Sequence, residues 1–488
     1  MSDGDRRTLI LLVAPLGSIA QLRGATYVVD EGCRLKSKCK VPSAVVSYAY
    51  LRRKFPGADL RVLGLLPESL MAELDNVPDS YDKAVSELKE AQLNNIKEGL
   101  SLLEEVNCGL GGLASDFTKD LRLEVVPMGG TFTMPKSVGD ACRGEGASRD
   151  VRGQLKVEAS LYDSQAVAAY LISRELAALR AVDYDEVRIY VDVTNAPNQL
   201  QVMTVRAAEG AVSALSMSTS VFLGFSALDP YVAGGELSLN VVEQRPLPGI
   251  RLPSGRPGRL LEPRVQDKDV IDVINKLRNR YITAILNLVG AAASINLGAL
   301  FLTPYLLREA GMDPLRVAEA HVAKYFELTE VTGQGGSVTL RRRIKIQEGL
   351  ETISYLSLAA KAMLRLDGEG CVKLKGLKDV AETLEDRGLG IAVNAVQEYS
   401  SIVKAAEGRD LSAGMCLQQL KGHSQSKTND REVARDLVAH AGLVENVVII
   451  RGRGEDLRAC LSCSAAASGG DPLDYLRGQV YAASGLQQ

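Results

Sequence analysis

Short apolar runs alternate with amphipathic segments through the first half of the chain. The runs are continuous, as in TLILLV, which is typical of strands buried on both faces of a parallel sheet. We expect core strands at Thr8–Val13, Leu60–Leu66, Leu121–Val126 and Glu186–Val193, with Ser218–Phe225 and Glu236–Val242 completing the sheet. Helices are expected at Pro42–Lys54, Asp79–Glu105 and Asp163–Leu179, and after Asn198 to about Gly210. This order predicts a doubly wound, Rossmann-like α/β domain.

The pattern becomes helical after Arg245–Pro263, a segment rich in Pro and Gly that we interpret as a linker. Further helices are expected at Val270–Arg278, Pro314–Leu328, Ile346–Leu366, Leu377–Glu385, Ile391–Ala405 and Leu411–Leu420. Val138–Lys156 is polar and glycine-rich and predicts a mobile loop, Thr332–Gly336 breaks the helical pattern, and Val447–Ile450 could be a short strand. The predicted organisation is an α/β domain at 1–244, a linker at 245–265, a helical middle section at 266–340 and a helical C-terminal domain at 341–488.

The segment from Tyr281 to Leu307 carries no charge and is long enough to span a bilayer. However, Asn287, Ser294 and Asn296 lie inside it and Pro304 interrupts its end. We therefore favour a buried helix pair, or a helix at a subunit interface, over a transmembrane helix. The N-terminus shows no signal peptide, so we expect a cytoplasmic protein with no membrane partner.

The overall charge limits the kinds of partner. The net charge is −3, with 46% hydrophobic and 24% charged residues, which argues against a protein coated along its length with nucleic acid. The densest basic cluster, Arg341–Lys345, could grip an RNA backbone or be a solvated face.

Eight cysteines are scattered along the chain. The close pairs are Cys33 with Cys39 and Cys460 with Cys463, and neither has a second pair nearby that would complete a zinc site. We expect mostly buried or free thiols, with a disulfide possible at either close pair.

Arg435 and His440 are the candidate catalytic pair. They stand five residues apart near the end of a predicted helix that Gly442 terminates. An imidazole can move protons near neutral pH, and a guanidinium can hold a phosphate and neutralise charge in the transition state. Metal-free RNA cleavage needs this combination. The structural alternative is a histidine at a helix C-terminus beside a surface arginine.

Small and polar residues gather in the loops that follow the predicted core strands. They are Gly17, Ser18, Gly129, Gly130, Thr194, Asn195 and Asn198. Ligands of doubly wound sheets bind outside the carboxyl ends of the strands, where such loops present N–H groups and amides to phosphates. No Gly-x-Gly-x-x-Gly motif follows the first strand, which disfavours an ordinary dinucleotide-binding domain. Ordinary turn chemistry is the alternative explanation for each loop.

Two stretches resemble known families. Arg435-Asp436-x-x-Ala-His440-Ala-Gly-Leu resembles the active-site helix of HEPN-domain ribonucleases, in which Asn commonly stands where this chain has Asp436. Asp192-Val-Thr194-Asn195-Ala-Pro-Asn198 resembles the ligand loop of CARF domains, with Asn195 and Ala196 in place of the usual His and Gly. Gly17-Ser18, Ser37-Lys38 and Gly129-Gly130-Thr131 are similar in order and placement.

The order of these stretches is that of the CARF–HEPN ribonucleases of type III CRISPR defence. The resemblance implies a CARF sensor that binds a cyclic oligoadenylate, most often the tetra-adenylate, across a two-fold homodimer. It further implies a C-terminal HEPN ribonuclease that cleaves single-stranded RNA without a metal or other cofactor. Arg435 and His440, with Asp436 beside them, would form the catalytic site.

Two other functions remain open from the sequence. The same sensor could drive a helical DNA-binding or scaffolding module that regulates without nuclease activity. Alternatively, the N-terminal domain could cleave its own cyclic ligand, with Thr194, Asn195 and Lys38 orienting a 2′-hydroxyl, although no general base is evident. Of the other histidines, His423 lies in a polar loop and could touch substrate or be a solvent-exposed bystander, and His321 is expected to be a structural or surface residue.

Overall fold

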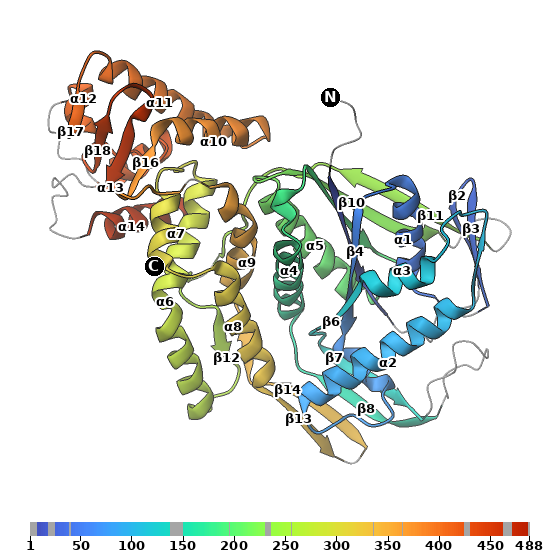
Figure 1. Cartoon of the computed structure of the whole chain (residues 1–488). Helices are drawn as coiled ribbons and strands as arrows, with labels where there is room; N and C mark the ends of the chain where they lie inside the picture. The colour runs from blue at the N-terminus through green and yellow to red at the C-terminus, as the bar shows by residue number, and fades with distance from the viewer. Residues whose placement is uncertain are drawn as a thin grey trace.

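The chain folds into an α/β part, a central group of helices and a smaller C-terminal lobe (Figure 1). The computed structural model describes residues 7–17, 25–38, 41–136, 150–194, 196–229, 236–254, 256–334, 336–363, 365–423, 430–461 and 471–486. In this view the smaller lobe lies at the upper left, above the helical group.

The α/β part is built on a nine-stranded sheet of order β5-β3-β2-β11-β10-β9-β1-β4-β6. Five neighbouring strands are parallel: β10 (Ser220–Asp229), β9 (Glu186–Asp192), β1 (Thr8–Pro15), β4 (Asp59–Pro67) and β6 (Leu121–Val126). The mixed side adds β11 (Glu236–Gln244), β2 (Ala25–Asp30), β3 (Cys33–Ser37) and β5 (Leu103–Val106). The predicted doubly wound sheet is confirmed, although Leu103–Val106 forms a strand where a helix was expected.

Helices cover both faces of this sheet. In β1, Leu9, Leu11 and Val13 point into one core while Ile10 and Leu12 point into the other. Such alternation with both sets buried explains why the strand is apolar throughout. The helices α4 (Leu161–Ala178) and α5 (Asn198–Leu215) cover the first face, and α1 (Ser43–Lys54), α2 (Tyr81–Ser101) and α3 (Leu113–Asp120) cover the second.

A second sheet joins segments from distant parts of the chain. Its order is β13-β14-β8-β7, with β7 at Gly130–Pro135, β8 at Val151–Val157, β13 at Thr329–Gln334 and β14 at Ser337–Arg342. The expected loop over 138–156 is therefore wrong for 151–156, while 137–149 lie outside the described residues. Thr332, Gly333 and Gln334 belong to β13, which pairs with β14, so the break in the helical pattern is a strand pair.

The basic cluster 341–345 belongs to this sheet region and is largely neutralised. Arg342 is fully buried and bonds to the carboxylate of Glu68, which lies in the short helix η3 (Glu68–Glu73). Arg343 pairs with Asp267 and Glu330, and Lys345 pairs with Glu262. Both expectations are wrong for Arg342. Its guanidinium has no access to solvent, so it can neither contact an RNA backbone nor form part of a solvated face.

The central helices share one continuous hydrophobic core with α4 and α5. They are α6 (Lys268–Asn296), α7 (Thr303–Ala310), α8 (Pro314–Glu327), α9 (Gly349–Ala359) and α14 (Pro472–Ser484); the short strands β12 (Leu261–Pro263) and β15 (Ile344–Ile346) pair beside them. The uncharged segment forms the second half of α6 and most of α7, so the buried helix pair is confirmed. Within the described residues, none of the helices has the length and apolar character needed to cross a membrane.

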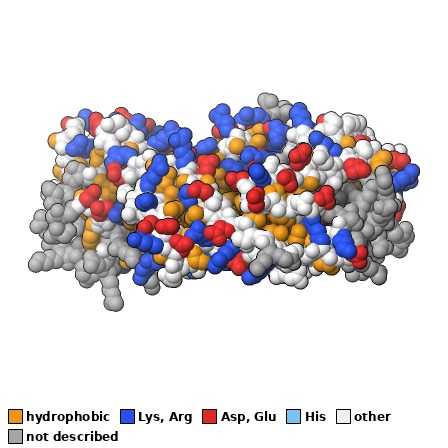
Figure 2. Space-filling model, turned by 90° about the horizontal axis from the view of Figure 1, so that it is seen from below, with side chains coloured by type: hydrophobic (Ala, Val, Ile, Leu, Met, Phe, Trp, Pro, Cys, Tyr) orange, Lys and Arg blue, Asp and Glu red, His pale blue; other side chains and the backbone are white. Residues whose placement is uncertain are grey.

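The C-terminal lobe contains a four-stranded antiparallel sheet of order β16-β19-β18-β17. The strands are β16 (Cys371–Lys373), β17 (Leu411–Cys416), β18 (Val448–Gly452) and β19 (Arg458–Leu461), and the helices are α10 (Leu374–Asp386), α11 (Val393–Ala406), α12 (Leu417–Lys421) and α13 (Asp430–Ala439). The expectation of an all-helical C-terminal region is therefore wrong, most clearly at 411–416. Acidic and basic side chains are interspersed on the face seen in Figure 2.

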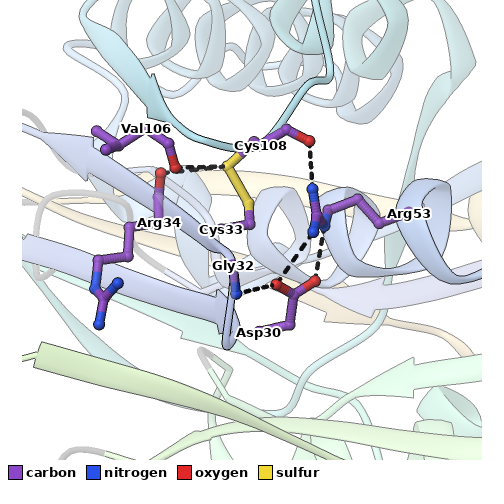
Figure 3. Close-up of a disulfide and its surroundings, with 7 residues drawn as sticks. All are labelled: Asp30, Gly32, Cys33, Arg34, Arg53, Val106 and Cys108. Atoms are coloured by element: carbon purple, nitrogen blue, oxygen red, sulfur yellow. Dashed lines mark hydrogen bonds and ion pairs between the residues drawn. A yellow bond between two sulfur atoms is a disulfide. The ribbon is translucent and has the colours of Figure 1, made fainter.

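Two disulfides whose cysteines both lie in the described ranges join residues that are far apart in the sequence. Cys33 bonds to Cys108 and Cys371 bonds to Cys460, with sequence separations of 75 and 89 residues. In Figure 3, Arg53 bridges the carboxylate of Asp30 and the carbonyl of Cys108, so an ion pair braces the first disulfide. The expectation of free thiols is wrong for these four residues and for Cys416, which is also disulfide-bonded, and neither of the two bonds joins cysteines that are close in sequence. Cys39 and Cys463 lie outside the described residues.

Replacing Arg342 with Met is expected to lower the free energy of unfolding by about 3–5 kcal/mol, because it leaves the buried carboxylate of Glu68 without its cation. Denaturant unfolding followed by circular dichroism measures this. Arg341→Met is the matched control, since Arg341 is exposed on the same strand. Equal unfolding midpoints for the two variants would contradict the assigned role.

Replacing Cys33 and Cys108 together with Ser is expected to lower the free energy of unfolding by roughly 2–4 kcal/mol, because the unfolded chain loses a long-range cross-link. The same denaturant titration, made on the oxidised protein, checks this value. Free thiols at both positions in native protein, detected with a thiol reagent, would show that the bond does not form.

Candidate functional site

The centre of the parallel sheet brings three of the predicted ligand-binding residues to one edge. Gly17 follows β1, and Thr194 and Asn198 follow the neighbouring strand β9. Among the five parallel strands, β4 and β6 lie on one side of β1 and the later strands β9 and β10 lie on the other, so their order reverses between β1 and β9. Asn198 is exposed at the first turn of α5. Ser18 and Asn195 lie outside the described residues.

Asp192 organises the loop after β9. Its Oδ1 accepts a hydrogen bond from the backbone N–H of Thr194 at 2.9 Å, and the Thr194 hydroxyl accepts one from Leu228 N at 3.0 Å. Burial raises the pKa of Asp192, although hydrogen bonds from Ser43, Thr194 and Ser47 oppose the shift. This buried carboxyl therefore fixes the loop from beneath and leaves Asn198 facing solvent.

The glycines after β6 have a packing role. A Cβ at Gly129 would lie 2.0 Å from the carbonyl oxygen of Ala159, so the backbone approach requires glycine there. Gly130 has a φ of +151° and Thr131 is exposed on β7. β6 is two strands from β1 in the sheet order, so these residues border the central loops without being adjacent to them.

Ser37 and Lys38 are not brought to the centre of the sheet. They stand at the end of β3, five strand positions from β1, which corresponds to about 24 Å across a sheet with strands about 4.8 Å apart. Ser37 is buried and Lys38 is exposed. Any ligand that contacts both Lys38 and Gly17 of one subunit must span this width.

The predicted catalytic residues lie on α13 and in the turn that ends it. Arg435 is 77% exposed, and its guanidinium lies 3.4 Å from the carboxylate of Asp436. His440 stands one residue beyond the end of α13, and its backbone N–H donates to Asp436 O at 2.9 Å. No contact within the described part of the chain joins Arg435 to His440.

The turn after His440 is held in one conformation. Ala441 and Gly442 both have positive φ, +53° and +85°, and Gly442 N donates to Leu437 O, as at a Schellman-type helix end. Phe301 N donates to Ala441 O, and a Cβ at Gly442 would meet Leu302 at 3.1 Å. The turn is thus docked against the connection between α6 and α7.

A buried carboxylate holds the imidazole of His440. Glu398 projects from α11, is 6% exposed and accepts a hydrogen bond from His440 Nδ1 at 2.8 Å. Its other oxygen accepts one from Lys421 Nζ, at the end of α12, at 2.6 Å. Asn394, one turn before Glu398, donates to the carbonyl of Val438 at 2.9 Å. Two residues of α11 therefore secure the end of α13.

The charges around His440 favour its protonated form. The hydrogen bond to Glu398 raises the pKa of His440, against burial and the charge of Lys421, which lower it, and Asp436 adds to the rise. For Glu398, burial acts to raise the pKa, but the hydrogen bonds from His440 and Lys421 outweigh it and lower the pKa of that carboxyl. A carboxylate only accepts hydrogen bonds, so Nδ1 of His440 carries the proton and Nε2 remains for a substrate.

The network continues outward to His423. Lys421 Nζ also lies 3.1 Å from Glu445, and the second oxygen of Glu445 lies 2.7 Å from Nδ1 of the exposed His423. His423 is solvent-exposed, as expected, and its ring has a carboxylate partner that the sequence did not indicate. His321 is buried, bonds to Val317 O, and burial lowers its pKa to about 4, which confirms the expected structural role.

Sequence reasoning did not identify Glu398, Lys421 or Glu445. The signal for Glu398 was present: the buried stripe of α11 reads Ala395, Glu398, Ile402 and Ala406, a charge inside an apolar helical face. No local signal marks Lys421 or Glu445, because only the tertiary fold brings them to Glu398.

The comparisons with known proteins concern the N-terminal half. Residues 11–230 match the model of the CARF domain of the CRISPR system endoribonuclease Csx1. The match covers β1 to β10 and includes Gly17, Thr194 and Asn198, but it ends before α6 and does not reach His440. No curated protein matches the chain. The α/β part is thus similar to a CRISPR-associated CARF domain, and the residues around His440 have only their geometry to support a function.

Proposed function

We propose that this protein is an endoribonuclease of type III CRISPR defence that a cyclic oligoadenylate activates. The observation that carries the nuclease assignment is His440, held through Nδ1 by buried Glu398 and left with Nε2 for a substrate. The match of residues 11–230 to a CARF domain supports the sensor. Because CARF domains bind cyclic oligoadenylates, the sensor ligand belongs to this class, with the tetra-adenylate the first candidate.

The reaction proposed is cleavage of single-stranded RNA by its own 2′-hydroxyl. The 2′-oxygen attacks the adjacent phosphorus, the bond from phosphorus to the 5′-oxygen breaks, and the products carry a 2′,3′-cyclic phosphate and a 5′-hydroxyl. His440 in its protonated form donates a proton to the departing 5′-oxygen. The exposed guanidinium of Arg435 neutralises the charge that develops on the phosphate. His440 supplies the general acid and Arg435 supplies the positive charge, so we propose that the reaction requires no metal.

A homodimer would complete both sites. One imidazole cannot both accept the 2′-hydroxyl proton and donate a proton at the same moment, and a second copy of the Arg435–His440 pair would supply the missing base. A ring of identical nucleotides also matches the two-fold symmetry of a dimer. The ligand is proposed to bind at Gly17, Thr194 and Asn198, at the edge where the strand order reverses.

The His440→Ala protein is expected to lose RNA cleavage by at least a hundredfold, because no proton donor remains for the 5′-oxygen. The measurement is cleavage of a fluorescent single-stranded RNA in EDTA, with and without cyclic tetra-adenylate. The wild-type protein should cleave only with the ligand. His423→Ala is the matched control, an exposed imidazole on the same network, and should retain activity. Full activity in His440→Ala would refute the assignment, and ligand binding without cleavage in the wild type would favour a regulator or scaffold.

The Asn198→Ala protein is expected to bind cyclic tetra-adenylate about tenfold more weakly, because it loses a hydrogen bond to a charged or polar ligand group. Isothermal titration calorimetry measures the change. Gln199→Ala is the control, since Gln199 is the next residue of α5 and is also exposed. Equal affinities for the two variants would place the ligand elsewhere.

A further inference from the structure

We infer that Glu398 is the positioning residue of the nuclease site, which holds His440 through Nδ1, and that Lys421, paired with the other oxygen of Glu398, opposes the effect of that carboxylate on His440. This inference rests on the proposed function for its catalytic consequence. Its structural part, the charge state and orientation of His440, is independent of any activity.

Both carboxylate oxygens of Glu398 are engaged by partners among the described residues. One of its oxygens meets His440 at 2.8 Å and the other meets Lys421 at 2.6 Å, so each oxygen has one cationic partner. Its side chain is 6% exposed and lies in the apolar stripe of α11. A charge buried there is costly unless its partners are fixed. The partners are fixed, because α11, α12 and the turn after α13 all converge on this carboxylate.

The two charged neighbours, the carboxylate of Glu398 and the ammonium of Lys421, act on His440 in opposite directions. Glu398 stabilises the imidazolium, whereas the ammonium of Lys421 destabilises it. Asp436 on α13 adds a weaker negative influence, and Glu445 faces Lys421 from the segment before β18. These are the charged groups that pack around the imidazole from α11, α12, α13 and the β18 approach.

The arrangement sets the pH range in which His440 is a proton donor. Its folded-state pKa is raised, so the imidazolium persists above the ordinary value and is lost as the pH rises through the raised pKa. Proton donation therefore declines on the alkaline side. Weakening the partnership with Glu398 moves this decline to lower pH, and removing the charge of Lys421 moves it to higher pH.

The direct test is the titration of His440 in the full-length protein, with histidine rings labelled with carbon-13 and followed by nuclear magnetic resonance. The chain has three histidines, so spectra of His440→Ala and His423→Ala assign the signals. Glu398→Gln is expected to lower the pKa of His440 and Lys421→Met to raise it. Glu445→Gln, one step further out, is the control and should shift it least. An unchanged pKa in Glu398→Gln, or shifts of the same sign in Glu398→Gln and Lys421→Met, would overturn the inference.

Cleavage assays then connect the titration to catalysis. Glu398→Gln is expected to lower kcat at least tenfold with little change in KM, and to move the alkaline limb of the pH profile to lower pH. Glu398→Asp, which keeps the charge, should recover part of the loss. If Glu398→Gln does not fold, Lys421→Met and Glu398→Asp still decide the question. Titration shifts of the expected signs without RNA cleavage by the wild type would refute the proposed function and leave the positioning of His440 intact.

Discussion

The buried ion pair between Arg342 and Glu68 joins the second sheet to the α/β part of the molecule. Arg342 ends β14, a strand contributed by residues more than 170 positions after the β8 strand with which it pairs, and Glu68 lies directly after the core strand β4. The guanidinium also lies over the rings of Tyr81, Tyr325 and Phe326, which come from α2 and α8. Two desolvated charges tolerate little displacement. The second sheet and α8 are therefore fixed to the α/β part at this point.

Packed helices connect the α/β part, the proposed sensor, to the C-terminal lobe. α5 begins beside the loop organised by Asp192 and, three turns later, packs Gly210 against Tyr355 of α9, where a Cβ would meet the ring at 2.4 Å. α9, α6 and α7 belong to the same hydrophobic core, and the connection between α6 and α7 supports the turn that carries His440. A continuous path of close packing thus runs from the proposed ligand edge to the proposed catalytic turn.

The sequence was sufficient wherever local pattern determines structure. Continuous apolar runs located β1, β4, β6 and β9 within about two residues, and the polar groups inside 281–307 identified a buried helix pair. Prediction from the sequence failed where segments far apart in the chain come into contact. The β8–β14 pairing and the disulfides Cys33–Cys108 and Cys371–Cys460 join residues that have no local signal for each other. The cluster 341–345 predicted an RNA-binding or solvated surface, because its composition does not show that the buried carboxylate of Glu68 pairs with Arg342. For the site, the sequence indicated His440 but not its partner, since Glu398 was one charge in an otherwise ordinary amphipathic helix.

The central claim is that ligand binding at the sheet edge releases RNA cleavage by the 2′-hydroxyl at His440. The most direct test is the chemical nature of the new RNA ends, determined by mass spectrometry after incubation with cyclic tetra-adenylate in EDTA. The account predicts a 2′,3′-cyclic phosphate on the upstream fragment and a 5′-hydroxyl on the downstream fragment. A 3′-hydroxyl with a 5′-phosphate would contradict it, because those ends require attack by water in place of the 2′-hydroxyl.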